Sequence, residues 1–141
     1  MLWYTLFLAT LMSAHPMACP VGHPTVLQEL LRSRAVVIGD VVAERPIADS
    51  GGDRGGWYPG TGYRVRVTEV LHGSVPDTLE LFSETSSGAF PMVVGQRYLM
   101  FVYRNLGRYL LDYCGHSGPL PERSADAATV RRLVRELQPP N

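Results

Sequence analysis

Alternating apolar and polar residues predict five β-strands along the middle of the chain. In the clearest one, residues 63–71, Tyr63, Val65 and Val67 alternate with polar neighbours, as the residues of a half-exposed strand do. The run 98–103 is apolar throughout, which is typical of a strand covered on both faces. The remaining strands are predicted over 35–42, 78–82 and 109–113.

Glycine and asparagine mark the bends of these strands. Gly39 interrupts the apolar stretch 35–42 and predicts a bulge in a strongly curved strand. Asn105 and Gly107 tolerate the positive φ of a tight turn, so the last two strands are expected to form a hairpin. That hairpin leads directly into Cys114.

Two helices are predicted, one before the strands and one after them. The first is capped by Thr25 and carries the apolar residues Val26, Leu27, Leu30 and Leu31 at helical spacing. The second is capped by Ser124, stops before Pro139, and presents a stripe made of Val130, Leu133, Val134 and Leu137.

The order of these elements predicts a mainly β fold. No strand–helix–strand alternation appears, and turn signals recur between the strands. Five antiparallel strands leave no open edge when they curl into a small Greek-key barrel, and a chain of 141 residues suffices for one such domain. A flat sheet covered by the two helices is the alternative.

The polar segment 49–62 contains six glycines and is expected to be a solvated connection between two strands. No Lys-Ser or Lys-Thr pair follows the glycines, so it is not a phosphate-binding loop. Trp57 and Tyr58 lie within it. They are candidates for contacts with a partner; the alternative is that they fold back over one end of the barrel.

The N-terminal stretch 1–14 is apolar and uncharged. It is shorter than the roughly twenty residues that a membrane-spanning helix needs, and its length suits the apolar region of a signal peptide. We therefore predict a signal peptide over 1–18, cleaved after Ala18 or after Ala14, and a secreted, periplasmic or cell-envelope location. A buried N-terminal helix is the alternative.

The chain has two cysteines, Cys19 and Cys114. In an exported protein a lone pair of cysteines is expected to form one disulfide. Alternatively, Cys19 carries a lipid and anchors the protein to a membrane, which leaves Cys114 as a free thiol. The two hypotheses exclude each other because both use the sulfur of Cys19.

Composition and motifs argue against an enzyme. Thirteen basic and thirteen acidic residues give a net charge of zero, so no long-range field favours nucleic acid. His23, His72 and His116 occur without an H-E-x-x-H or C-x-x-C motif. Ser117 lies in GHSGP, which lacks the second glycine of a nucleophile elbow. We expect no catalytic site, no metal and no cofactor.

Several motifs, taken in order, resemble the netrin-like domain, also called the tissue-inhibitor-of-metalloproteinases-like domain. VVIGDV at 36–41 is similar to the family's VFxGxV strand, and YRVRVTEVLHG at 63–73 is similar to its next strand and turn. GQRYLMF at 95–101 is followed by a cysteine and a Pro-Leu pair, as in the family. The resemblance implies an OB-type barrel over 19–141.

The resemblance also implies a non-enzymatic binding domain with a disulfide between Cys19 and Cys114. The partner surface would include Cys19, Pro20, Val21, Gly22 and His23, together with adjacent strand loops. The partner would be an extracellular or envelope protein, and the family suggests a protease. The alternative function is that of an envelope lipoprotein with a structural or assembly role, anchored through Cys19.

One departure from the family concerns the first cysteine. In the vertebrate inhibitors a Cys-x-Cys sequence begins the mature chain, and the α-amino and carbonyl groups of its first cysteine chelate the zinc of the protease. Here Cys19 aligns with the second cysteine of that motif. The resemblance therefore transfers the disulfide, but not the zinc-chelating group.

Overall fold

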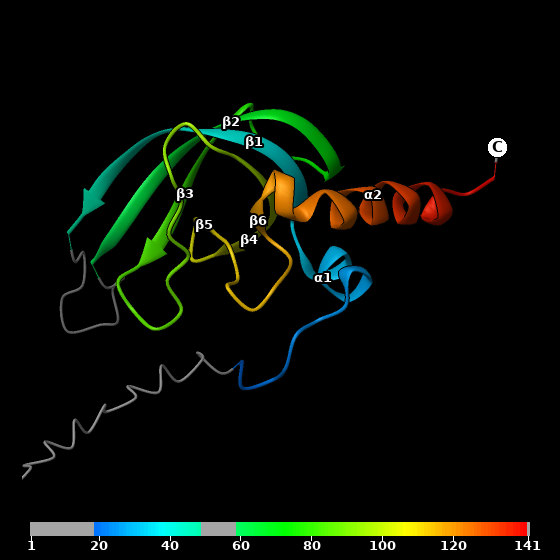
Figure 1. Ribbon diagram of the computed structural model, residues 1–141, viewed down its shortest axis with the longest axis horizontal. Coiled ribbons are helices and arrows are strands. Elements are labelled where there is room, and N and C mark those ends of the chain that lie inside the picture. Colours follow the sequence, from blue (N-terminus) through cyan, green and yellow to red (C-terminus); the bar gives the residue numbers. More distant parts are fainter. Residues whose placement is uncertain (1–18, 49–58, 141) are drawn as a thin grey trace, which may run out of the picture.

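The computed structural model describes residues 19–48 and 59–140, and consists of a curved β-sheet with two helices on one side (Figure 1). The elements in chain order are α1 (Val26–Arg32), β1 (Ala35–Ile47), β2 (Gly60–Gly73), β3 (Thr78–Glu84), β4 (Arg97–Asn105), β5 (Arg108–Leu110), β6 (Gly118–Pro119) and α2 (Leu120–Leu137). The predicted mainly β class with a short N-terminal and a longer C-terminal helix is confirmed.

The strands form one mixed sheet in the order β1-β2-β3-β5-β4-β6, and β1 also pairs with β4. Five strands therefore close into a near-ring, which agrees with a barrel rather than a flat sheet. The prediction that all pairs are antiparallel is wrong, because β3 and β5 are parallel. The reason is topological: a ring with an odd number of strands cannot have every neighbouring pair antiparallel.

Several strand boundaries also differ from the prediction: β1 continues to Ile47, and β2 begins at Gly60, inside the segment 49–62 that was expected to be a connection. The last predicted strand, 109–113, is cut short, because β5 ends at Leu110. The N–H of Cys114 donates to Oδ1 of Asp112 (2.9 Å) and the N–H of Gly115 donates to its backbone oxygen (3.2 Å), so a turn takes the chain away from the sheet. The two-residue strand β6, which pairs with β4, was not predicted.

The C-terminal helix begins earlier than predicted. We expected Ser124 to cap it, but α2 starts at Leu120 and Pro119 occupies the cap position. Pro121 in the first turn has a φ suited to a helix start, and Glu122 complements the positive end of the helix dipole. Ser124 is already inside the helix, and its hydroxyl donates to the backbone oxygen of Pro121 (3.3 Å).

The first helix is capped as predicted. The N–H of Gln28 donates to the Thr25 hydroxyl oxygen (3.1 Å), and the N–H of Thr25 donates to the Gln28 side chain (2.9 Å). These reciprocal bonds form a capping box, which satisfies two backbone donors at the helix start.

Two hydrophobic clusters lie on opposite faces of β1 and β4. The inner cluster fills the ring and is made of Ala35, Val37, Val41, Tyr63, Val65, Leu79, Leu81, Met92, Tyr98, Met100 and Val102. The outer cluster lies under the helices and is made of Leu30, Val36, Ile38, Leu99, Phe101, Ala127 and Val130. Residues 35–38 of β1 and 98–102 of β4 are buried on both faces, and the sequence there is apolar without alternation.

The predicted bulge at Gly39 is confirmed by a shift in the β1–β2 register between Ile38 and Gly39. A side chain at this position would have no room. A Cβ atom would lie 2.6 Å from Cγ1 of Val65 and 2.8 Å from the backbone oxygen of Arg66. The absence of a side chain thus lets β2 cross closely over β1 where the sheet curves into a ring.

Candidate protein-interaction site

The segment 19–24 approaches the sheet as an irregular strap, as its prolines and glycine predict. Its first turn is closed by the N–H of Gly22, which donates to the backbone oxygen of Cys19 (2.9 Å). The strap then enters α1 through the cap at Thr25. The helix therefore fixes the C-terminal end of the strap. A different contact holds its N-terminal end, at Cys19.

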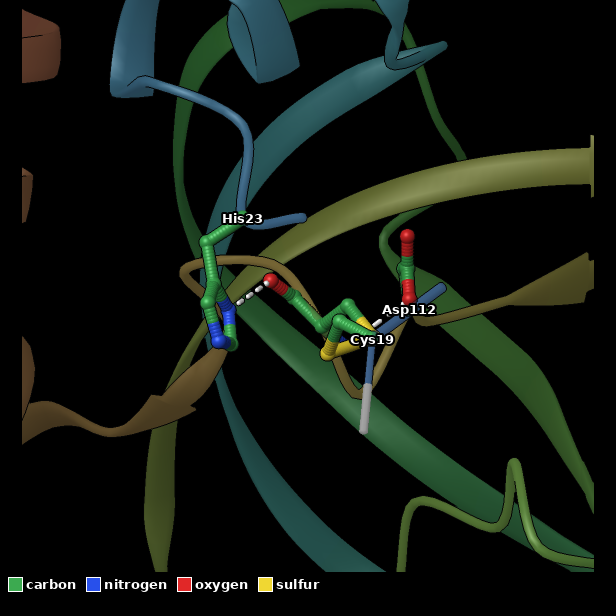
Figure 2. Close-up of a disulfide and its surroundings, with 4 residues drawn as sticks. Cys19, His23 and Asp112 are labelled. Atoms are coloured by element: carbon green, nitrogen blue, oxygen red, sulfur yellow. Dashed lines mark hydrogen bonds between the residues drawn. A yellow bond between two sulfur atoms is a disulfide. The ribbon is translucent and has the colours of Figure 1, made fainter. Parts of the chain in front are cut away.

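The disulfide between Cys19 and Cys114 supplies that contact (Figure 2). The two Cα atoms are 5.8 Å apart, and the cysteines are separated by 95 positions in sequence. The predicted disulfide is thus present, and it joins the strap to the loop that follows β5. With the sulfur of Cys19 in this bond, no thiol remains there for a lipid.

Hydrogen bonds hold the backbone of Cys114 on both sides (Figure 2). Its N–H donates to Asp112, and its carbonyl oxygen lies 3.0 Å from Nδ1 of His23. Because a carbonyl can only accept, Nδ1 of His23 carries the proton in this bond. His23 therefore adds a second link between the strap and the loop, and its own side chain remains exposed.

A buried carboxyl group, Glu29, ties α1 to the same loop. Its side chain is 0% exposed, and its Oε2 accepts the N–H of His116 (2.6 Å). Its Oε1 has no hydrogen-bond partner among the described residues and lies directly against Gly115, where any Cβ atom would overlap it. The loop can pass here only because residue 115 has no side chain.

Burial raises the pKa of the Glu29 carboxyl, and the negative charge of Asp112 adds to the shift. The hydrogen bond from His116 and the positive charge of its side chain partly offset it. Burial also raises the pKa of the Tyr103 hydroxyl, which lies near the Glu29 and Asp112 charges. The carboxyl and the phenol therefore both hold their protons to a higher pH than they would in an unfolded chain.

The side chain of His116 links the end of the strap to α2. Its Nε2 lies 2.8 Å from the backbone oxygen of Pro24, and its Nδ1 lies 3.2 Å from Oδ2 of Asp126. Both partners are acceptors, so the ring can donate to both only as an imidazolium. Asp126 is also 3.4 Å from Arg123, which completes a polar cluster at the junction of strap, loop and helix.

A hollow of about 420 Å³ lies beside the disulfide. It is lined by Pro20, Val21, Gly22, His23, Pro24, Gln28, Arg32, Tyr103, Asp112, Tyr113 and Cys114. Val21, on the rim, is 95% exposed, although it is an apolar residue in a covalently held segment. The strap therefore presents an apolar side chain beside a hollow with polar groups of both charges.

The residues of the strap that were predicted to bind a partner are thus brought together. Cys19 lies in the disulfide, and Pro20, Val21, Gly22 and His23 line one hollow with Cys114. Trp57 and Tyr58, the other predicted contacts, lie outside the described residues.

Glu29 was not predicted as a buried residue. Val26, Leu27, Leu30 and Leu31 placed the apolar side of the helix away from it, whereas the structure exposes Leu27 and Leu31 and buries Glu29 beside Leu30.

Two further observations concern metals and membranes. Within residues 19–48 and 59–140, no three His, Cys, Asp or Glu side chains are grouped so that they could hold a metal ion. Neither of the two helices in this part of the chain has the length and apolar character that crossing a bilayer requires.

Comparison with known proteins adds no relative, since neither a family model nor a curated protein matches the chain. The family resemblance rests on the sequence motifs and stays a prediction.

Proposed function

We propose that this protein is an exported, non-enzymatic binding domain of the netrin-like type, and that its partner docks on the strap 19–24. The observation that carries the proposal is Val21. It is 95% exposed at the rim of a hollow, in a segment anchored by a disulfide and by the cap of α1. A partner can bury an apolar side chain that a rigid segment holds in solvent at little cost in conformational entropy.

The strand order supports the finer fold assignment within this proposal. A near-ring in the order β1-β2-β3-β5-β4, closed by β1 and β4, is the arrangement expected of a five-stranded OB-type Greek-key barrel. The disulfide joins the strap to the loop after the last long hairpin, as the family resemblance implied. The alternative of a lipid anchor on Cys19 requires a sulfur that is used in the disulfide.

Rigidity of the strap favours binding because little conformational entropy is lost when a partner docks. The disulfide and the bond from His23 to Cys114 restrict the backbone of the strap, and the capping box restricts its junction with α1. The family suggests a metalloprotease as the partner.

The test is inhibition of a panel of metalloproteases by the purified, oxidised protein, with fluorogenic peptide substrates. Inhibition at micromolar concentration is expected for at least one protease. Val21→Arg should weaken it by at least about tenfold, as a charge at the centre of an apolar contact does. The matched control is Val42→Arg, because Val42 is also an exposed valine (43%) but lies on β1.

Each outcome has a defined meaning. If no protease is inhibited at micromolar concentration, a metalloprotease is not the partner. If Val21→Arg and Val42→Arg weaken inhibition equally, the strap is not the docking surface. The intact mass of the exported protein, with and without reductant, establishes the cleavage site and the disulfide in the same sample.

A further inference from the structure

A second hollow, of about 450 Å³, adjoins the one beside the disulfide. We call it the hairpin hollow, and the one beside the disulfide the strap hollow. Residues at the ends of β4 and β5 line the hairpin hollow, among them Tyr103, Arg104, Asn105, Leu110 and Leu111. Tyr103, Asp112 and Tyr113 line both hollows and form a shared wall between them.

The two most exposed large apolar side chains of the described residues lie beside these two hollows. Val21, 95% exposed, lines the strap hollow. Leu106, 77% exposed, directly follows Asn105, which lines the hairpin hollow. The strap, the two hollows and the tip of the β4–β5 hairpin therefore make one continuous surface, with an exposed apolar residue beside each hollow.

Leu106 has a backbone conformation that leucine rarely adopts. Asn105 pairs with Arg108, so Leu106 and Gly107 form a two-residue turn, and both have a positive φ, 46° and 79°. Asn, Asp and Gly are favoured at the first position of such a turn, because a bulky side chain is strained at positive φ. The exposed leucine gains little from packing in return, and an unrepaid strain of this kind points to a function.

The continuous surface carries more positive than negative charge. Apart from His23, the charged side chains that line the two hollows are Arg32, Arg104 and Asp112. Neither arginine forms an ion pair with an acidic side chain in the part of the chain that the structure describes. The guanidinium carbon of Arg104 lies 5.6 Å from the ring centroid of Tyr109, so this exposed cation rests on an aromatic ring at the hairpin hollow.

We propose that the two hollows bind one extended peptide segment of the docking partner, with apolar side chains against Val21 and Leu106 and an acidic side chain against Arg104. This proposal rests on docking at the strap and extends it across the shared wall. Each hollow, of about 420 and 450 Å³, is within the range of roughly 300 to 1,000 Å³ that ligand sites occupy. A segment is required because the two apolar contacts lie beside different hollows.

The test is a titration of the oxidised protein with the peptide N-acetyl-Leu-Val-Glu-Leu-Val-amide. The ¹H–¹⁵N amide shift of Gly22 reports on the strap hollow, and that of Leu111 reports on the hairpin hollow. Saturable shifts at both amides are expected, with one common dissociation constant of about 1 mM. The same peptide with Gln in place of Glu should bind about tenfold more weakly, because it loses a charge-assisted contact.

Arg104→Gln should bind the Glu and the Gln peptide with equal affinity, because the cation that distinguishes them is gone. Arg32→Gln is the matched control. Arg32 is also an exposed arginine, but it lines only the strap hollow, so its variant should keep the tenfold difference between the peptides.

Leu106→Asn should change stability and binding in opposite directions. Asparagine tolerates the positive φ of the turn, so the urea midpoint of unfolding should rise. Binding of the Glu peptide should weaken about fivefold, because an apolar contact is lost. The matched control is Leu137→Asn, since Leu137 is also an exposed leucine (54%) but ends α2, and this variant should bind like the native protein.

Three results would overturn the proposal. The first is an absence of saturable shifts at Leu111, which would confine the peptide to the strap hollow or exclude it from the surface. The second is a difference between the Glu and Gln peptides that persists in Arg104→Gln. The third is native affinity in Leu106→Asn. Docking at the strap is tested separately by protease inhibition and Val21→Arg, so the failure of either proposal is distinguishable from that of the other.

Discussion

Two strand pairings complete the ring, and we call them the β1–β4 seam and the β3–β5 seam. They differ in how many residues pair. At the β1–β4 seam the strands pair continuously, from Ala35 opposite Val102 to Asp40 opposite Arg97. At the β3–β5 seam only Leu81 and Tyr109 pair. The first seam is held by a backbone ladder, whereas the second has little ladder of its own.

The comparison shows where cross-links are needed in a small barrel. The β1–β4 seam is buried on both faces, so apolar packing and backbone bonds stabilise it together. The β3–β5 seam depends on the short strand β5, and the loop after β5 is the one that the disulfide, Asp112 and Glu29 hold. The covalent bond is placed close to the weaker closure.

Of the changes proposed, removal of the disulfide should lower the free energy of unfolding most. A link across 95 positions contributes about 4 to 5 kcal/mol in the chain-entropy model, so the Cys19→Ser, Cys114→Ser double variant should lose stability of this order. Urea unfolding followed by circular dichroism measures the loss. Hydrogen exchange should show faster exchange in β5 while β4 remains protected.

A matched control for that experiment is the native protein in reductant, which keeps both side chains. If β4 loses protection as early as β5, the two seams form one cooperative unit and the proposed difference between them is wrong.

Glu29→Gln should stabilise the folded protein at neutral pH, where α1 meets the loop that carries the disulfide. The amide keeps an acceptor for the N–H of His116 but removes a buried charge, and a gain of roughly 1 to 2 kcal/mol is expected. The folded state raises the pKa of Glu29, so it holds the proton more tightly than the unfolded chain. Stability from this group is therefore complete at low pH and is lost as pH rises through the folded pKa.

Urea unfolding between pH 4 and pH 8 measures this effect. The other titratable groups near the Glu29 carboxyl are His116, Asp112 and Tyr103. The native protein should lose stability relative to Glu29→Gln across this range. A constant difference at all pH values would contradict the raised pKa.

Asp40→Asn should weaken the end of the β1–β4 seam. Asp40 accepts from Arg97 at 2.7 and 3.1 Å and from Arg66 at 3.2 Å, and these arginines lower its pKa to about 2. The stabilisation is present above the ordinary pKa of 3.8 and is lost as pH falls through about 2. Because both arginines are well exposed, we expect a loss of about 1 kcal/mol.

Thermal unfolding between pH 2 and pH 6 measures that loss. Asp126→Asn, which removes another acidic partner of an arginine, is a control on α2. A difference between native protein and Asp40→Asn that is as large at pH 2 as at pH 6 would contradict the assignment to Asp40.

Arg108→Gln should have the smallest effect, at the β3–β5 seam. Loss of the cation–π contact with Phe82 is expected to cost about 0.5 to 1 kcal/mol. Urea unfolding measures it, and Arg132→Gln on α2 is the control. A loss of several kcal/mol would indicate that this stacked pair, rather than the disulfide, closes the seam.

Local patterns predicted most of the elements correctly. Alternation located the strands, Thr25 capped α1 as expected, and Gly39 marked a bulge. The start of α2 was missed because Ser124 is a favourable cap residue, whereas the helix begins at Leu120 without a side-chain cap. The early end of β5 was missed because the alternation continues through Tyr113, although the turn at Asp112 withdraws the backbone from β4.

Local periodicity predicted a mainly β chain, and the two cysteines predicted a disulfide that joins the N-terminal segment to the loop after β5. Only the tertiary structure buried Glu29 against Gly115 and placed Arg108 over Phe82. In both cases the partners lie far apart in sequence, and their contact depends on which faces of the strands meet when the ring closes. A two-residue period determines the face of a side chain within one strand, but not what lies opposite that face in the fold.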